Sequence, residues 1–245
     1  MPHEADIPTI YHIEGSRAFR VIWLCEELGI PYELVFKRGD PAASMATLRT
    51  VHPLLPMAPV VRYGGELIVE SGAILEILLT RHGKGRLVPA ADSADFLFHV
   101  QWLHFAEATV MSRMLTERFV AMASGMDVDK MPKGYTVGMD VTAPAMIGST
   151  AVFGYVDDFL SKHAFFGGAE FTAADIMMEH ALRVAKLVVW ADTNDYQHIK
   201  AWRKRVAARP AYECAARAAT PGGADEYGLP IATGHPLMRP STSVS

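Results

Sequence analysis

The segment Thr9–Leu28 reads Thr-Ile-Tyr-His-Ile-Glu-Gly-Ser-Arg-Ala-Phe-Arg-Val-Ile-Trp-Leu-Cys-Glu-Glu-Leu and predicts a strand, a tight loop and a helix. The first five residues are mostly β-branched or aromatic, as in a buried strand. Gly15 permits a sharp turn, and Ser16 is a favoured helix N-cap. A helix N-terminus carries partial positive charge, so we expect the Ser16 hydroxyl and several free backbone N–H groups to form an anion site. An ordinary strand–helix unit with a capping serine is the alternative.

Composition narrows the class of protein. The chain has 245 residues, half of them hydrophobic, and a net charge of −4, which fits one large domain or two small ones. The sequence contains no basic excess, no polybasic run and no apolar run of the ~18 residues that span a membrane, so we expect neither nucleic acid nor membrane as a partner. The polar, acidic N-terminus is not typical of a signal peptide.

Cysteine and histidine usage indicates a reducing compartment and no metal. Cys25 and Cys214 lie far apart, and neither belongs to a Cys-x-x-Cys pair. This predicts free thiols and a cytoplasmic location. The ten histidines are scattered and form no His-Glu-x-x-His motif, so no metal site is expected.

The first third of the chain alternates strand and helix signals. Three further strands are predicted at 32–36, 60–63 and 67–69, the last two joined by a Gly64-Gly65 turn. A helix is expected from Ser71 to about His82, and 40–51 is less regular, with room for a short helix. Three prolines between 53 and 59 exclude a regular helix there. The predicted order is β-α-β-(α)-β-β-α over residues 1–84.

Beyond a linker at 85–95, rich in glycine, proline and alanine, the signals are helical. Helices are expected from 96 to about 124, from 151 to 163 and from 199 to 208, and the segment 125–148 is unassigned. Thr172 and Asp175 form the sequence pattern of a capping box, which starts a helix reaching about Trp190. That helix is apolar nearly all round and is predicted to be the centre of an all-α domain, 96–219. Arg209-Pro210 is expected to end the last helix, and residues 220–245 to form a tail.

Four motifs stand in a fixed order along the chain: Gly-Ser-Arg-Ala-Phe-Arg at 15–20, Ala-Pro-Val-Val at 58–61, Glu-Ser-Gly-Ala-Ile-Leu at 70–75 and Phe-Thr-Ala-Ala-Asp at 171–175. Together they resemble the cytosolic glutathione S-transferase superfamily, in particular its serine-type, bacterial and fungal members, over roughly residues 8–216. The resemblance implies a thioredoxin-like N-terminal domain (βαβαββα) followed by an all-α C-terminal domain. It also implies glutathione as co-substrate and a homodimer.

The resemblance gives Ser16, four residues before Arg20, the role of hydrogen-bond donor to the glutathione sulfur. Lowering a thiol pKa from about 8.5 to about 6.5 takes ~2.7 kcal/mol. A hydrogen bond to a charged group supplies ~1.5–3 kcal/mol and a helix N-terminus ~0.3–1. Ser16 is therefore sufficient without a metal. Tyr11 is the rival donor, since tyrosine-type classes place a tyrosine at the end of this strand.

The same resemblance implies the residues that bind glutathione. Pro59 matches the cis-proline of the fold, and Ala58 would pair its backbone with the cysteinyl residue. Ser71 and its helix N-terminus would hold the γ-glutamyl carboxylate, and Glu70 the γ-glutamyl amine. The alternatives are a trans loop proline at Pro59 and a simple helix cap at 70–71.

Two stretches depart from the pattern of many relatives. Leu54-Leu55-Pro56-Met57 stands where they have Gly-Lys before the cis-proline, so the lysine is absent and the loop is one residue longer. Ile13-Glu14 stands where the relatives often have Ser-Pro, and we expect both residues in the floor of an electrophile pocket. His104 and Met111, on one helical stripe with Ala108 and Leu115, are expected in its wall, although packing on the central helix is the alternative.

These features predict an enzyme that adds glutathione to a small apolar electrophile, or uses it to displace a group. Peroxidase, isomerase or dehalogenase activity is compatible with the same site. The alternative is a non-catalytic binding or scaffold protein on the same fold.

Overall fold

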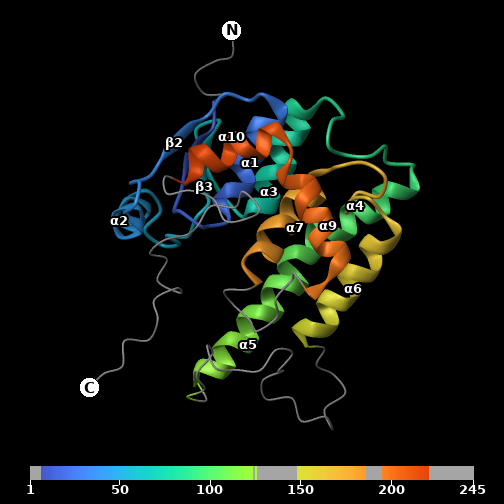
Figure 1. Ribbon diagram of the computed structural model, residues 1–245. Helices are drawn as coiled ribbons and strands as arrows, with labels where there is room; N and C mark the ends of the chain where they lie inside the picture. The colour runs from blue at the N-terminus through green and yellow to red at the C-terminus, as the bar shows by residue number, and fades with distance from the viewer. Residues whose placement is uncertain (1–6, 124, 126–147, 186–194, 221–245) are drawn as a thin grey trace. The chain divides into compact units, whose positions relative to one another are not determined.

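The computed structural model describes residues 7–123, 125, 148–185 and 195–220, which form two compact units (Figure 1). One unit comprises Met1–Leu87 together with Val206–Ser245, and the other comprises Val88–Arg205. The division after Leu87 falls inside the predicted linker, 85–95. The unassigned segment 126–147, the end of the helix predicted to reach Trp190, and the tail beyond residue 220 lie outside the described residues.

The first unit is built on a mixed sheet of four strands. These are β1 (Thr9–Tyr11), β2 (Glu33–Val35), β3 (Val60–Tyr63) and β4 (Glu66–Val69), in the order β2-β1-β3-β4. β1 pairs in parallel with β2 and antiparallel with β3, which forms a hairpin with β4. Gly64 and Gly65 have φ values of 59° and 87°, which a glycine turn adopts without strain. The predicted strands and turn are confirmed.

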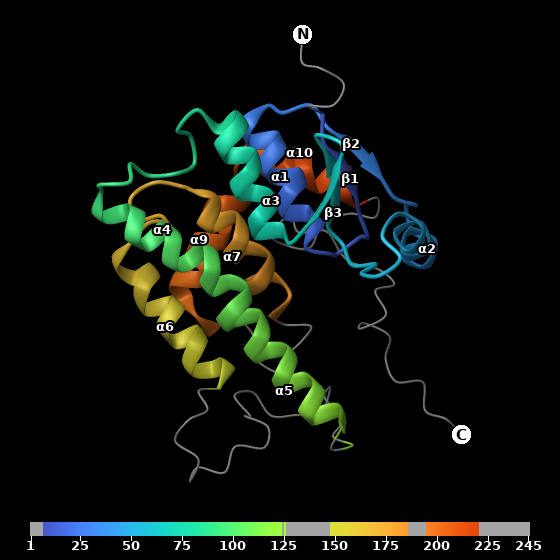
Figure 2. The same ribbon diagram turned by 180° about the vertical axis from the view of Figure 1, so that it is seen from behind.

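Helices cover both faces of this sheet (Figures 1 and 2). α1 (Ala18–Leu28) and α3 (Ser71–Leu78) lie on one face, and α2 (Pro41–Val51) lies on the other. A π-helical turn, η2 (Leu79–Gly83), follows α3. α2 is longer and more regular than expected because the Asp40 side chain accepts the N–H of Ala43 at 2.9 Å and Pro41 occupies the first helical position. An Asp-Pro pair is a sequence signal for a helix start.

The last helix, α10 (Pro210–Ala219), corrects two predictions. Arg209-Pro210 does end α9, but Pro210 is also the first residue of a further helix, because proline is tolerated where no helical N–H is needed. The ring of Tyr212 packs edge-on against Phe19 and Trp23 of α1, with centroids 5.3 and 4.8 Å apart. By its contacts α10 belongs to the first unit, whereas the sequence assigned it to the helical domain.

The second unit is all-helical, as predicted. It contains α4 (Ala94–Phe105), the π-helical η3 (Ala106–Met111), α5 (Ser112–Ala123), α6 (Ser149–Lys162), α7 (Ala173–Arg183) and most of α9 (Gln197–Ala207). Every residue of α7 is buried, and the Thr172–Asp175 capping box is present. Asp175 also accepts hydrogen bonds from Trp202 Nε1 at 2.8 Å and from the N–H of Phe166 at 2.9 Å. The predicted central helix is confirmed over 173–183.

Candidate functional site

Ser16 lies in the short loop between β1 and α1 and is half-buried. The sequence predicted it as the N-cap, but α1 starts at Ala18 with Arg17 as N-cap and no side-chain cap bond. Ser16 Oγ instead accepts the N–H of Ala18 at 3.3 Å. Ala18 is the first helical residue, whereas a capping side chain accepts the N–H of the second or third. This contact orients the oxygen and leaves the hydroxyl hydrogen uncommitted within the described part of the chain.

The N–H groups around the start of α1 are largely paired, which corrects the expectation of several free donors. Ser16 N donates to Ile13 O at 3.0 Å, Phe19 N to Ser16 O at 3.2 Å and Arg20 N to Arg17 O at 3.1 Å. The tight turn folds these donors back onto the loop carbonyls. The Ser16 hydroxyl is therefore the main group in this loop that could donate a hydrogen bond to an anion.

Glu70 and Ser71 begin α3. Ser71 is its first residue and is 3% exposed, whereas the Glu70 side chain is exposed and makes no side-chain cap bond. Glu70 has φ 71°, a left-handed conformation that is costly for a residue with a Cβ and often marks a functional position. A simple capping role does not account for Glu70.

Arg20 connects the two helices of the site, a role that sequence reasoning missed. It is fully buried in α1, and its Nη1 donates to Ser71 Oγ at 3.0 Å. An arginine among the apolar residues 18–25 of α1 was the available signal, because arginine is almost never fully buried unless it is paired. The contact fixes the Ser71 hydroxyl relative to α1 across 51 residues of sequence.

The bond between Ala58 and Pro59 is cis, as predicted. Ala58 stands two residues before the start of β3, and among the described residues its backbone N–H and C=O enter no hydrogen bond. Before it, the Met57 N–H donates to Leu55 O at 2.8 Å, and the Leu55 N–H donates to His52 Nδ1 at 3.1 Å. Ala58 therefore offers an unpaired strand edge next to a tightly turned loop.

Tyr11 and Ile13 belong to the packing between the sheet and α2. Ile13 forms a core cluster with Leu48 and Val60, and Tyr11 packs against that cluster. Glu14 is 2% exposed, and its Oε1 accepts the N–H of Gly39 at 2.8 Å. The Glu14 carboxylate is thus held by the loop between β2 and α2. Neither Ile13 nor Glu14 is tested as a pocket residue, and both stay predictions, as does Tyr11 as the rival donor.

The predicted stripe through His104 and Met111 is not a single face. His104 and Ala108 are exposed, whereas Met111 is 4% exposed. The reason is η3, whose wider π-helical turns over Ala106–Met111 shift the register that an uninterrupted α-helix would keep. His104 and Met111 as pocket residues remain predictions.

Neither a reactive Cys25 thiolate nor a metal-holding group is found among the described residues. Cys25 is completely buried, and burial raises the pKa of its thiol to about 12, which keeps it protonated. Among the described residues, no group of three or more His, Cys, Asp or Glu side chains could hold a metal.

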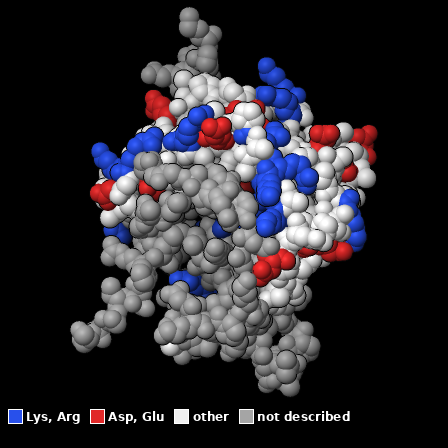
Figure 3. All heavy atoms as spheres, viewed as in Figure 1, with Lys and Arg blue, Asp and Glu red and all other residues white. Residues whose placement is uncertain are grey.

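Within the same residues no helix combines the length and the apolarity that crossing a membrane requires. Both signs of charge are interspersed on the face drawn in Figure 3.

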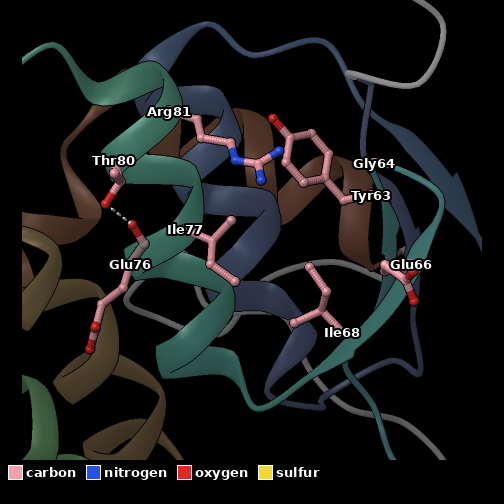
Figure 4. Close-up of a pocket in the computed structure, with 8 residues that line it drawn as sticks. All are labelled: Tyr63, Gly64, Glu66, Ile68, Glu76, Ile77, Thr80 and Arg81. Carbon is pink, nitrogen blue, oxygen red and sulfur yellow. Dashed lines mark hydrogen bonds between the residues drawn. The ribbon is translucent and has the colours of Figure 1, made fainter.

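A groove of about 400 Å³ lies between the β3–β4 hairpin and α3 (Figure 4). Ile68 of β4 and Ile77 of α3 point toward each other across it, and the Arg81 guanidinium lies 5.1 Å from the Tyr63 ring centre. The charged residues that line the groove, Glu66, Glu76 and Arg81, lie around these two isoleucines. Ser16, Ala58 and Ser71 do not line it, so it is separate from the candidate site.

These features define a thioredoxin-like unit with a cis-proline, a serine at the start of its first helix and an acidic-serine pair at the start of its third. The sequence matches the family description "Glutathione S-transferase, N-terminal domain" over residues 8–80 and "Glutathione S-transferase, C-terminal domain" over 144–210. Glutathione S-transferase 3 of Schizosaccharomyces pombe is 31% identical over 212 residues, covering 84% of this chain and 86% of that protein. The chain therefore belongs to the glutathione S-transferase family.

Solved structures support the fold independently. A delta-class glutathione transferase from Nilaparvata lugens superposes with a TM-score of 0.66 at 22% identity, covering 88% of this chain and 95% of that one. The theta-class glutathione S-transferase of Xanthomonas axonopodis pv. citri, solved with glutathione bound, gives a TM-score of 0.62 at 21% identity, with 86% and 97% covered. At these identities the likeness concerns the fold alone.

Proposed function

We propose that this protein binds glutathione, stabilises its thiolate through Ser16 and transfers it to small apolar electrophiles. The observation that carries the proposal is the Ser16 hydroxyl, whose oxygen accepts the Ala18 N–H at 3.3 Å. With the oxygen so oriented, the hydroxyl hydrogen is available to donate to sulfur. One such bond to a charged acceptor is worth ~1.5–3 kcal/mol, which covers the ~2.7 kcal/mol needed to move a thiol pKa by two units.

Three groups would hold the tripeptide. Ser71, held by Arg20, and the N-terminus of α3 would receive the γ-glutamyl carboxylate, and the exposed Glu70 carboxylate would take its amine. Ala58 would pair its N–H and C=O with the cysteinyl backbone, adding the ligand to the edge next to β3. This pairing would bring the cysteinyl sulfur within reach of Ser16.

The chemical step follows from thiolate formation. The sulfur lone pair forms the new bond to an electrophilic carbon. In a substitution the leaving group departs with its bonding electrons, and in an addition the carbanion takes a proton from solvent. Serine stabilises the anion and need not take up a proton, so no general base is required at the sulfur. Peroxidase, isomerase or dehalogenase reactions would use the same thiolate.

The electrophile, the assembly state and the location are part of the proposal. Ile13, Glu14, His104 and Met111 are the candidates for contact with the electrophile, and we expect broad use of flat or flexible apolar compounds. We further propose a cytoplasmic homodimer, in keeping with two free cysteines among the described residues. Sedimentation at micromolar concentration tests the dimer, since the monomer mass of 26.8 kDa would refute it.

The experiment is retention on immobilised glutathione combined with turnover of a halonitrobenzene. We expect elution by free glutathione and conjugation that falls in Ser16→Ala. The second candidate is a non-catalytic binding protein, which the apolar 54–57 loop favours because it lacks the lysine of many relatives. Specific retention with no turnover of any electrophile would support that candidate, and absence of both would refute the proposed function.

A further inference from the structure

The loop before Ala58 decides what meets the carboxyl end of the thiol co-substrate. Val60 pairs with Val69, which puts Ala58 and Ser71 at the same end of the β3–β4 hairpin. A peptide with its amino end at Ser71 and its middle on Ala58 extends by about 3.3–3.6 Å per residue. Its carboxyl end is then directed toward residues 52–57, which precede Ala58. This placement rests on the proposed function.

The loop exposes apolar side chains where the ligand would end. Leu54 is 96% exposed, Met57 54% and Leu55 38%. Residues 53–57 are Pro-Leu-Leu-Pro-Met and contain no cation. A carboxylate that approaches such a surface loses water and gains no charged partner, which disfavours it relative to a neutral group.

The polar side chain of the loop is a neutral donor. The Leu55 N–H donates to His52 Nδ1 at 3.1 Å, so this nitrogen carries no proton and Nε2 carries it. A neutral imidazole N–H donates to the oxygen of a carboxylate, an ester or an amide. It therefore discriminates much less among them than a lysine or an arginine, which adds a full charge to the contact.

We propose that this site receives the carboxyl end of its co-substrate through an apolar loop and a neutral donor, and so accepts γ-glutamyl-cysteinyl thiols whose terminal carboxylate is masked as an ester or amide. Glutathione remains a substrate, but its glycyl carboxylate is not the group that the site recognises. Leu54, Met57 and His52 are the residues that determine this specificity.

The test compares glutathione with its glycyl monoethyl ester, in dissociation constant by calorimetry and in kcat/KM with one electrophile. The expected ratio between the two thiols is within about threefold in both measurements. A cation in the subsite would instead make the ester about tenfold or more weaker. A loss of that size in either measurement overturns the inference.

Introduced cations sharpen the test. In Leu54→Lys and Met57→Lys, affinity for glutathione should rise several-fold while affinity for the ester stays unchanged, and both side chains are exposed enough to leave the fold intact. Leu97→Lys is the matched control, since Leu97 is 71% exposed on α4 and carries the same change of charge.

Arg49, on the last turn of α2, is the nearest preceding cation in the sequence. If Arg49→Gln weakens glutathione tenfold and spares the ester, a cation does bind the carboxylate and the inference is wrong.

The outcomes separate this inference from the proposed function. If both thiols bind and neither is turned over, the proposed enzymatic activity is refuted. The two dissociation constants still show whether the subsite recognises the terminal carboxylate. Turnover of glutathione with a tenfold loss for the ester refutes the subsite and supports the enzyme. If neither glutathione nor its ester binds, both the subsite and the proposed function are refuted.

Discussion

Replacing Ser16 by alanine should raise the pKa of enzyme-bound glutathione by one to two units. In this variant the N–H groups of Phe19 and Arg20 stay paired with the backbone carbonyls of Ser16 and Arg17, and only the Ala18 N–H loses its acceptor. The loss is then that of one hydrogen bond to a charged group, ~1.5–3 kcal/mol, and each pKa unit corresponds to about 1.4 kcal/mol.

The assay is a titration of the bound thiol by ultraviolet absorbance of the thiolate, at saturating glutathione. The pH dependence of kcat/KM for the electrophile should shift upward by the same amount. At neutral pH, activity should fall about threefold to 25-fold, which is the loss of thiolate when the pKa rises from about 6.5 to about 7.5–8.5. Activity should recover as the pH is raised, because the thiolate itself remains competent. Melting temperature should change little, since Ser16 is half-buried in a loop.

Two control variants make the assignment specific. Ser16→Thr retains a hydroxyl and should keep most of the lowering of the thiol pKa. Tyr11→Phe removes the rival hydroxyl and should leave the thiol pKa as it is. An unchanged titration in Ser16→Ala, with an upward shift in Tyr11→Phe, would refute the reasoning and move the thiolate donor to Tyr11.

Four further predictions concern stability and thiol chemistry. Asp175→Ala should lose at least about 3 kcal/mol of unfolding free energy in urea, because three buried N–H donors are left without an acceptor at ~1–3 kcal/mol each. Burial raises the pKa of Asp175 from 3.8 to about 6, so the folded state binds this proton more tightly than the unfolded state does. The free energy of unfolding should therefore fall as the pH rises through that interval. Asp175→Asn should remove this pH dependence, and a free energy of unfolding that rises over the same interval would contradict the prediction. Arg209→Gln should cost about 1–2 kcal/mol by the same assay, since the Arg209 contacts to Glu27 at 2.6 and 2.8 Å hold α10, and an unchanged midpoint would show that this ion pair is not needed. Native protein treated with iodoacetamide should be modified at Cys214 before Cys25, whose thiol pKa is about 12, as peptide mass spectrometry would show.

The parts of the fold that the sequence predicts are those with local signals. The strand at Thr9, the Gly64-Gly65 hairpin and the capping box at Thr172 depend on residues within a few positions of one another. The cis bond at Pro59 was predicted from the resemblance, through a motif adjacent in sequence. Short-range backbone preferences therefore sufficed for most of the order of elements, whereas the family was predicted from the resemblance carried by the four ordered motifs.

The errors come from ambiguous local signals and from long-range contacts. Pro210 reads as a stop, yet the same residue starts α10, and only packing against α1 decides between the two. The stripe through His104 assumes 3.6 residues per turn, which η3 breaks. The contact of the Glu14 carboxylate with the N–H of Gly39 links two loops 25 residues apart, and no local pattern indicates it.

The same contacts explain how this site could work with few charges. Arg20 is the buried cation nearest to Ser16 in the sequence, and it donates to Ser71, so its charge would support the proposed γ-glutamyl subsite. On the proposed function, the Ser16 hydroxyl would stabilise the thiolate, and the Nε2–H of His52 would donate to the carboxyl end of the ligand. Neutral donors lose little hydration when a ligand covers them, whereas a lysine gives up a strongly hydrated ammonium group. A site of this kind would gain less affinity from the charges of its co-substrate and would depend more on the placement of each hydrogen bond. The orientation of Ser16 Oγ by the Ala18 N–H would then matter for activity.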